Sequence, residues 1–235
     1  MKNVLLTWYT LLKDAVFPVF CFGCKKEGIL LCETCYKTID THGVYVCPVC
    51  HVEVPSGKPC FACRELTPLI AHSAVGIFKE DNLLGKLIHA YKYNFITDAG
   101  FIFEKLIADF LEKNKHQFSD VQMIVPVPLH RRRLAERGFN QAEEIGKIVV
   151  RQLNLPMQNI LQRKIFTQQQ AKLGKQERQE NIKNAFQIKK ETDVSGKNVL
   201  LVDDVFTTGS TLGECARVLK QNGAGDVSAF TLVRG

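Results

Sequence analysis

The sequence predicts an α/β fold with a largely parallel sheet and a small cysteine-rich module before it. Eight of the nine cysteines fall between positions 21 and 63, and from about residue 72 short apolar strands alternate with helical periodicity. A chain of 235 residues has room for one ordinary core and one small accessory module. We therefore expect three segments: an N-terminal helix at 1–20, a cysteine-rich module at 21–68 and an α/β domain at 71–235.

The first segment has the pattern of an amphipathic helix. Five apolar residues recur at helical spacing before Pro18, namely Leu5, Trp8, Tyr9, Leu12 and Val16. The apolar run is about half as long as the roughly 20 residues that cross a bilayer, and it has no cleavage site of a signal peptide. Its polar face carries too few Lys and Arg for an anionic lipid surface. We expect a helix that packs on its own protein, no stable membrane insertion, and a cytoplasmic location.

The α/β pattern predicts strands at 121–127, 185–188, 198–203 and 227–233, and a helix at 210–221. Three further helices are defined by apolar stripes: Leu84, Leu87, Ile88 and Tyr91; Phe103, Leu106, Ile107 and Phe110; and Ala142, Ile145, Gly146 and Val149. Residues 163–184 are polar and interrupt the alternation. We expect a long mobile loop or a short exposed helix there, and long loops in compact domains are usually functional.

The clustered cysteines form four C-x-x-C pairs in two similar halves, each with a loop of seven or nine residues between its pairs. A C-x-x-C turn aims two thiolates at one tetrahedral ion, so two turns complete a four-sulfur zinc site. A segment of about fifty residues with few apolar side chains also needs a bound metal ion, or a similar cross-link, to fold. We expect a double zinc-ribbon-like module with one or two structural zinc ions, held by Cys21, Cys24, Cys32, Cys35, Cys47, Cys50, Cys60 and Cys63.

Other interpretations of these cysteines are disulfides, redox chemistry and an iron–sulfur cluster. Disulfides conflict with a cytoplasmic location, a thioredoxin-type site needs only one pair, and the spacing does not favour a cluster. Pairing within each half is simplest, whereas interleaved pairing or a single occupied site stays open. His42 and His51 could replace a cysteine as a ligand, but with eight cysteines available we interpret them as ordinary loop residues. The ninth cysteine, Cys215, shares a helical face with apolar residues and is predicted to be a small core residue.

Residues 199–211 read VLLVDDVFTTGST, an apolar strand that leads into two aspartates, a Thr/Gly loop and a helix start. The strand delivers Asp203 and Asp204 to the carboxyl edge of a parallel sheet, where open α/β folds bind ligands. The backbone N–H groups and hydroxyls of the loop can surround a phosphate at the helix N-terminus. Carboxylates can accept hydrogen bonds from two neighbouring hydroxyls, and the donors beside them can hold a phosphate. Together these groups suit a ribose phosphate. The loop lacks the Lys and the spacing of a Walker loop, which argues against an ATPase.

This stretch closely resembles the thirteen-residue signature of type I phosphoribosyltransferases, which bind phosphoribosyl pyrophosphate (PRPP) with magnesium. The resemblance implies that Asp203 and Asp204 hold the ribose hydroxyls. It implies that the 5′-phosphate lies against the following loop, formed by Thr207, Thr208, Gly209, Ser210 and Thr211.

A narrower resemblance covers nearly the whole chain. The sequence is similar to the ComF/GntX group of competence proteins, which join a cysteine-rich zinc module to a domain of the type I phosphoribosyltransferase fold. The segments that carry it are Val125–Pro128, Arg137–Gln141, and Thr167, Gln170, Leu173, Arg178, Asn181 and Phe186 in their spacing. The resemblance implies a phosphoribosyltransferase-like domain at 71–235 and a role in the uptake of single-stranded DNA during natural transformation.

The net charge of +7 is concentrated in one stretch. Residues 130–190 hold 14 Lys and Arg against 5 Glu, and the rest of the chain is slightly acidic. In the transferase fold, the strand end before this stretch carries the pyrophosphate loop. The resemblance therefore implies that Val127, Pro128, Leu129, His130 and Arg131 face pyrophosphate.

One pyrophosphate needs only two or three cations, so the surplus favours a longer polyanion, and nucleic acid is the obvious one. A solvated basic face is the competing interpretation. Single-stranded nucleic acid is usually bound by cations together with aromatic stacking platforms. The candidate residues are Arg131, Arg132, Arg133, Arg137, Lys164 and Phe166.

Two functions remain. The first is a competence protein of the ComF type that binds PRPP, processes or takes up single-stranded DNA and works with other DNA-uptake proteins. The alternative is an active PRPP-dependent transferase, in which an unidentified nitrogen nucleophile attacks the anomeric carbon and pyrophosphate leaves.

Overall fold

The computed structural model describes residues 18–93, 99–165, 182–189 and 192–235. Residues 1–17, which hold most of the predicted N-terminal helix, lie outside the described residues. The chain forms two compact units, one of Met1–Asp40 with Lys79–Ile102 and one of Thr41–Phe78 with Phe103–Gly235. The second four cysteines therefore share a unit with the sheet. The domain boundaries expected from the sequence stay predictions.

The first unit combines the first four cysteines with two helical segments. The short helix α2 (Glu33–Tyr36) begins directly after Cys32 and contains Cys35, and α3 (Leu83–Tyr93) follows later in the chain. The apolar stripe predicted for α3 is buried, as expected. The chain packs closely at Gly23, where an added Cβ would lie 2.6 Å from the Cys35 Sγ.

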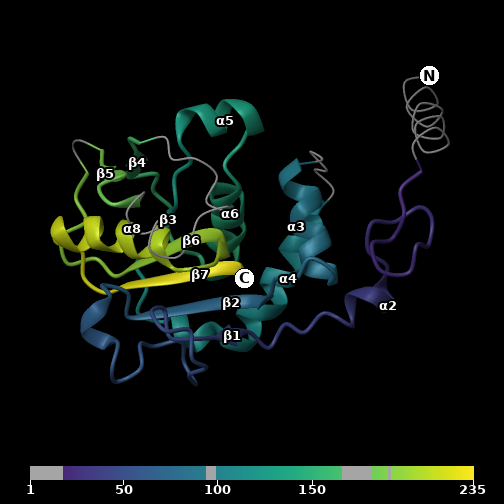
Figure 1. Ribbon diagram of the computed structural model, residues 1–235, viewed down its shortest axis with the longest axis horizontal. Helices are drawn as coiled ribbons and strands as arrows, with labels where there is room; N and C mark the ends of the chain where they lie inside the picture. The colour runs from purple at the N-terminus through teal and green to yellow at the C-terminus, as the bar shows by residue number, and fades with distance from the viewer. Residues whose placement is uncertain (1–17, 94–98, 166–181, 190–191) are drawn as a thin grey trace. The chain divides into compact units, whose positions relative to one another are not determined.

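The second unit is built on a five-stranded sheet of order β1-β2-β7-β6-β3 (Figure 1). Only β1, at the edge, is antiparallel to its neighbour; β2, β7, β6 and β3 run parallel. The carboxyl ends of these four strands therefore meet at one edge, with β6 between β7 and β3. The strand bounds are β1 Val44–Tyr45, β2 Ala71–Ile77, β3 Met123–Pro126, β6 Val199–Phe206 and β7 Val227–Arg234.

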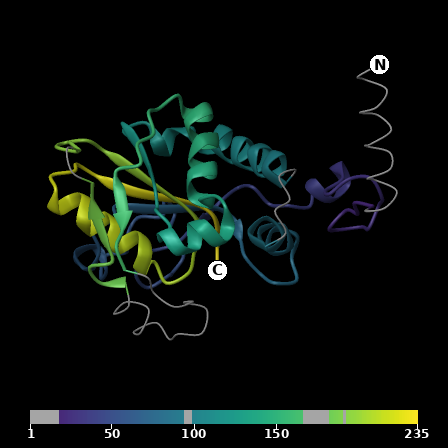
Figure 2. The same ribbon diagram turned by 90° about the horizontal axis from the view of Figure 1, so that it is seen from above.

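Helices cover both faces of this sheet (Figures 1 and 2). On one face α8 (Ser210–Gln221) buries Leu212, Cys215 and Leu219 against Val199 and Leu201 of β6. On the other face lie α4 (Ala99–Asn114) and α6 (Gln141–Leu153). The apolar stripes predicted for these two helices are buried, and so is Cys215, so the fold class and the core role of Cys215 are confirmed.

Several short elements complete the unit. A 3-10 turn (η1, Arg64–Leu66) follows the last clustered cysteine, and another (η2, Lys115–Phe118) follows α4. The helix α5 (Arg131–Arg137) follows β3. The strands β4 (Leu161–Arg163) and β5 (Phe186–Ile188) pair in an antiparallel ladder. Most of the loop or helix expected at 163–184 lies outside the described residues. In the described part of the chain, no helix has the length and apolarity that a membrane span requires.

A buried histidine of β2 packs against the last residue of β6. His72 of β2 is fully buried, its Nε2 lies 3.0 Å from the Thr231 Oγ1, and its ring stacks on Phe206 with centroids 3.9 Å apart. Burial, assisted by the charges of His51 and Arg234, lowers the pKa of His72 to about 3. The imidazole is therefore neutral in the folded protein at neutral pH.

This pKa predicts acid-sensitive stability. Between about pH 3 and pH 6.5 the unfolded chain binds a proton at His72 that the folded protein does not, so the stability contribution is complete above pH 6.5 and declines below it. On lowering the pH from 7.0 to 5.5, the free energy of unfolding should fall by about 1 kcal/mol more in the wild type than in His72→Gln. Urea unfolding at both pH values measures this difference. Equal losses in the two proteins would contradict the assignment.

Candidate functional site

The acidic pair lies on the central parallel strand, close to its carboxyl end. Asp203 and Asp204 are both half-buried, and β6 continues past them to Phe206, so the strand is longer than the sequence predicted. The backbone N–H of Asp204 donates to the Asp203 Oδ1 at 2.9 Å. This bond fixes one carboxylate oxygen of Asp203.

The loop after β6 provides donors for an anion. Gly209 has φ of 75°, a left-handed conformation, and a Cβ there would lie 2.9 Å from the Phe206 ring and 2.9 Å from the Pro48 carbonyl oxygen. The Thr208 and Ser210 hydroxyl oxygens are 2.9 Å apart. The N-cap of α8 is Gly209, which has no side chain, and the Thr208 Oγ1 accepts from the N–H of Ser210 at 3.4 Å. The N–H groups of the first turn of α8, which includes Thr211, can point at a phosphate.

The loop after β3 is held from two sides. The N–H of Val127 donates to the Val202 carbonyl of β6 at 2.9 Å. The Asn140 side chain donates to the Val127 carbonyl at 3.0 Å and accepts from the N–H of Ala142 at 3.2 Å, so it also caps α6. Asn140 belongs to the Arg137–Gln141 segment, for which the sequence predicted no contact. In the structure its side chain connects the loop after β3 to the start of α6.

His130 of the same loop is used by the helix that follows. Its Nδ1 accepts from the N–H of Arg132 at 3.2 Å, which caps α5. The neighbouring residues Pro128, Leu129 and Arg131 line a cleft of about 340 Å³. In the predicted pyrophosphate loop, His130 therefore caps a helix, and Pro128, Leu129 and Arg131 border a cleft beside β3.

Arg163, the last residue of β4, is a charged residue that sequence reasoning missed. It is only 8% exposed and lines the same cleft as Arg131. Burial and then the charge of Arg133 lower its pKa, while Cys215 and Asp203 act in the opposite direction. The guanidinium therefore lies within electrostatic reach of both the α5 cations and the acidic pair. The one signal in the sequence is that Arg163 alternates with Leu161 on one face of a short strand.

The candidate nucleic-acid residues lie mainly on α5. Arg131 and Arg132 are exposed, Arg132 pairs with Glu136 at 3.4 Å, and the Arg137 guanidinium donates to the Gln141 side chain at 3.2 Å. Arg133 is half-buried on the same helix.

The remaining candidates come from the segment after β4. Lys164 is exposed and lines a second cleft of about 560 Å³ together with Arg217, whereas Phe166 lies outside the described residues. Lys189 lines both this cleft and the one beside Arg131. Cations from separate segments thus border two clefts that share a residue.

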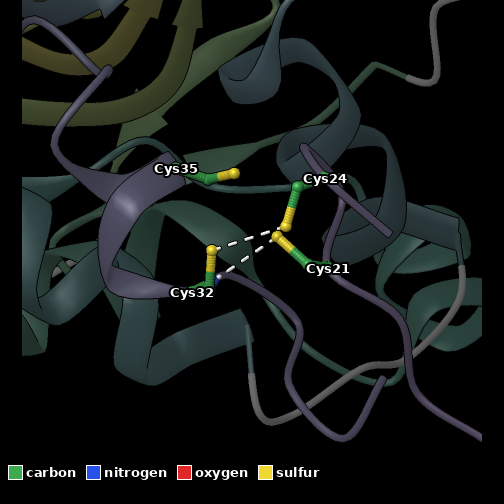
Figure 3. A group of neighbouring side chains, drawn as sticks. All are labelled: Cys21, Cys24, Cys32 and Cys35. Carbon is green, nitrogen blue, oxygen red and sulfur yellow. Dashed lines mark hydrogen bonds between the residues drawn. The ribbon is translucent and has the colours of Figure 1, made fainter. Parts of the chain in front are cut away.

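All eight clustered cysteines gather in two groups of four, one from each half of the segment. The Sγ atoms within each group lie within 4.8 Å of one another. All nine cysteines are described, and none forms a disulfide. We call the two groups the first quartet (Cys21, Cys24, Cys32 and Cys35; Figure 3) and the second quartet (Cys47, Cys50, Cys60 and Cys63).

The sulfur geometry fits a tetrahedral ion. Sulfurs at about 2.3 Å from zinc are about 3.8 Å from each other. The Cys24 and Cys32 Sγ atoms are 3.6 Å apart in the first quartet, and those of Cys50 and Cys60 are 3.7 Å apart in the second. The Cys32 N–H also points at the Cys21 Sγ at 3.4 Å (Figure 3). Each quartet can therefore hold one metal ion through four sulfurs.

The protonation of the thiols follows the same pattern in both quartets. Burial raises the pKa of Cys21 and of Cys47, but backbone N–H groups of their own turns and of the facing cysteine lower each to about 6. Neighbouring thiols, assisted by burial, raise the pKa of Cys35 and of Cys63 to about 12. Thiolates that lie this close together repel one another. A divalent cation offsets this repulsion, because it attracts all four thiolates at once.

Comparison with known proteins agrees with this architecture. The model of the phosphoribosyl transferase domain matches residues 140–235. Competence protein F of Haemophilus influenzae is 29% identical over 91% of this chain and 90% of its own. DNA utilization protein YhgH of Escherichia coli K12 is 31% identical over 92% and 97%, and competence protein ComFC of Streptococcus pneumoniae R6 is 30% identical over 89% and 90%.

These relatives match along nearly their whole lengths. At this identity and coverage the chain belongs to the ComF family of competence and DNA utilization proteins, which carry a phosphoribosyltransferase domain.

Proposed function

We propose that the protein binds PRPP with Mg²⁺ at the carboxyl edge of its sheet and acts on single-stranded DNA during natural transformation. The observation that carries the proposal is the acidic pair Asp203 and Asp204 near the end of β6, followed by a hydroxyl-rich loop that leads into the N-terminus of α8. The names of the relatives support a DNA-related role. We place the protein in the cytoplasm, where incoming single strands arrive and PRPP is made.

Each part of PRPP has a matching group at this edge. The carboxylates of Asp203 and Asp204 accept hydrogen bonds from the 2′- and 3′-hydroxyls of the ribose, and residues 207–211 donate to the 5′-phosphate. The pyrophosphate lies toward Val127–Arg131, where Arg131 supplies positive charge. Magnesium, when bound, neutralises the diphosphate.

The carboxylates are the sharpest test of PRPP binding. Asp203→Asn with Asp204→Asn removes the charge that strengthens the bonds to the ribose hydroxyls, and PRPP affinity should fall at least tenfold, since such bonds contribute roughly 1.5–3 kcal/mol. The control is Asp226→Asn, which neutralises an exposed carboxylate before β7, at the opposite edge of the sheet. Isothermal titration with Mg²⁺ and PRPP measures both. Unchanged affinity in the double variant would refute the assignment.

We propose that both metals are zinc and that both are structural, because four sulfurs leave no open position for water. The purified protein should contain two zinc ions per chain. Cys24→Ser and Cys50→Ser, which alter one quartet each, should each retain one ion. Elemental analysis by mass spectrometry gives the count, and a stoichiometry of one in the wild type would contradict the proposal for one quartet.

Single-stranded DNA is proposed to bind across the cations of α5 and the two clefts beside them. One diphosphate uses two or three cations. More cations than this border the two clefts, among them Arg131, Arg163, Lys164 and Lys189. A polyanion that follows these clefts would release counterions at each phosphate contact. Other DNA-uptake proteins are the partners that we expect.

Charge reversal at Arg131, Arg132 and Arg133 tests this surface. Affinity for an oligodeoxythymidine should fall, and the slope of log affinity against log salt should become shallower by about 2, at about 0.7 for each lost phosphate contact. The matched control reverses three exposed lysines elsewhere, Lys105, Lys115 and Lys220. Fluorescence anisotropy between 50 and 300 mM salt measures the slope. The same slope in the α5 variant as in the control would remove α5 from the interface.

A further inference from the structure

The second quartet is built into the same unit as the loop that follows the acidic pair. Residues 41–78 and 103–235 form one compact unit, whereas the first quartet belongs to the other. Just before the second quartet, β1 pairs with β2, and Val46 is 3% exposed within the core that also contains Phe206. The two quartets therefore have similar sulfur geometry but different surroundings.

A direct contact joins the second quartet to the phosphate-binding loop. Pro48 lies inside the Cys47–Cys50 turn, and its carbonyl oxygen would be only 2.9 Å from a Cβ at Gly209. Pro48 and Val49 also line a pocket of about 280 Å³ together with Thr208, Gly209 and Ser210. The turn that presents two of the sulfurs thus forms one wall against the loop.

A second contact runs through the Phe206 ring, directly before the loop. One edge of this ring meets His51, which follows Cys50, at a centroid distance of 5.5 Å. One of its faces stacks on the His72 ring, and the backbone N–H of His72 donates to the Gly57 carbonyl at 2.9 Å. Gly57 lies in the nine-residue loop of the second quartet, and a Cβ there would lie 1.9 Å from the His72 carbonyl oxygen. Both ends of the quartet's loop therefore support Phe206.

We infer that the second quartet, when it holds its metal, positions the phosphate-binding loop through Pro48 and Phe206. Metal bound by Cys47, Cys50, Cys60 and Cys63 fixes the Cys47–Cys50 turn and with it one wall of the loop. Loss of this metal frees the turn and allows residues 207–211 to leave the conformation that binds phosphate. Pro48 and Phe206 are positioning residues, and the first quartet has no such task. The ligand part of this inference rests on the proposed PRPP function.

Hydrogen exchange measures the positioning without any ligand. Cys24→Ser and Cys50→Ser each replace one exposed cysteine, the first from one quartet and the second from the other. Amides of 205–213 should exchange at least fivefold faster in Cys50→Ser and at the wild-type rate in Cys24→Ser, with the β3 peptide as the internal reference. The inference is overturned if Cys50→Ser has lost the metal of the second quartet, still melts cooperatively and keeps the wild-type exchange rate in this peptide.

The effect of PRPP on metal binding can be measured in a protein with an intact second quartet. This experiment covers the case in which Cys50→Ser does not fold. If metal and phosphate ligand stabilise one loop conformation, each must strengthen the binding of the other. In Cys24→Ser, PRPP with Mg²⁺ should slow zinc release to a chromogenic chelator at least threefold. An unchanged release rate at saturating PRPP overturns the inference. If PRPP does not bind at all while exchange at 205–213 still depends on the second metal, the proposed function fails and the positioning role stands.

Discussion

The parallel pairing of β6 between β3 and β7 is the constraint on which the candidate site depends. Because all three strands run in one direction, the acidic pair at the end of β6 and the loop after β3 reach the same edge of the sheet. Hydrophobic burial holds this arrangement: Leu200, Leu201 and Val202 are fully buried between helices on the two faces. The polar residues that follow are therefore presented by a rigid base.

Negative and positive side chains occupy different parts of that edge. Carboxylates occupy the centre, at Asp203 and Asp204, and guanidinium groups occupy the side beyond β3, from Arg131 on α5 to the buried Arg163. A ligand with hydroxyls in the middle and phosphates at both ends matches this order. The cations beyond the cleft exceed what such a ligand needs, which is why we propose a second, polymeric anion.

Much of this was predictable from the sequence, because it depends on local patterns. Alternation and helical periodicity predicted the parallel sheet, the range of α8 and the buried stripes of α3, α4 and α6. Spacing also predicted two similar groups of four cysteines. The site residues proposed from the signature lie where a strand end and a helix start are expected to place them.

Other features depend on contacts between residues far apart in the chain, and no local pattern reports those. Nothing around Pro48 or Gly57 indicates that the second quartet borders Gly209 and His72. Pro48 and Gly209 are more than a hundred residues apart in the chain, and Gly57 meets His72 only once β2 is in place. The helix α5 was seen only as a basic stretch, since three consecutive arginines show no apolar stripe. Asn140 and Arg163 acquire their roles only when the loop after β3 is in place.

The central claim is that one edge of the sheet binds both ends of PRPP. Phosphorus NMR of PRPP with Mg²⁺ tests it directly, because the 5′-phosphate and the diphosphate give separate resonances. We predict that adding the zinc-loaded protein shifts or broadens both sets of resonances, with saturation at one ligand per chain. Resonances that stay unchanged at an excess of protein would contradict the account.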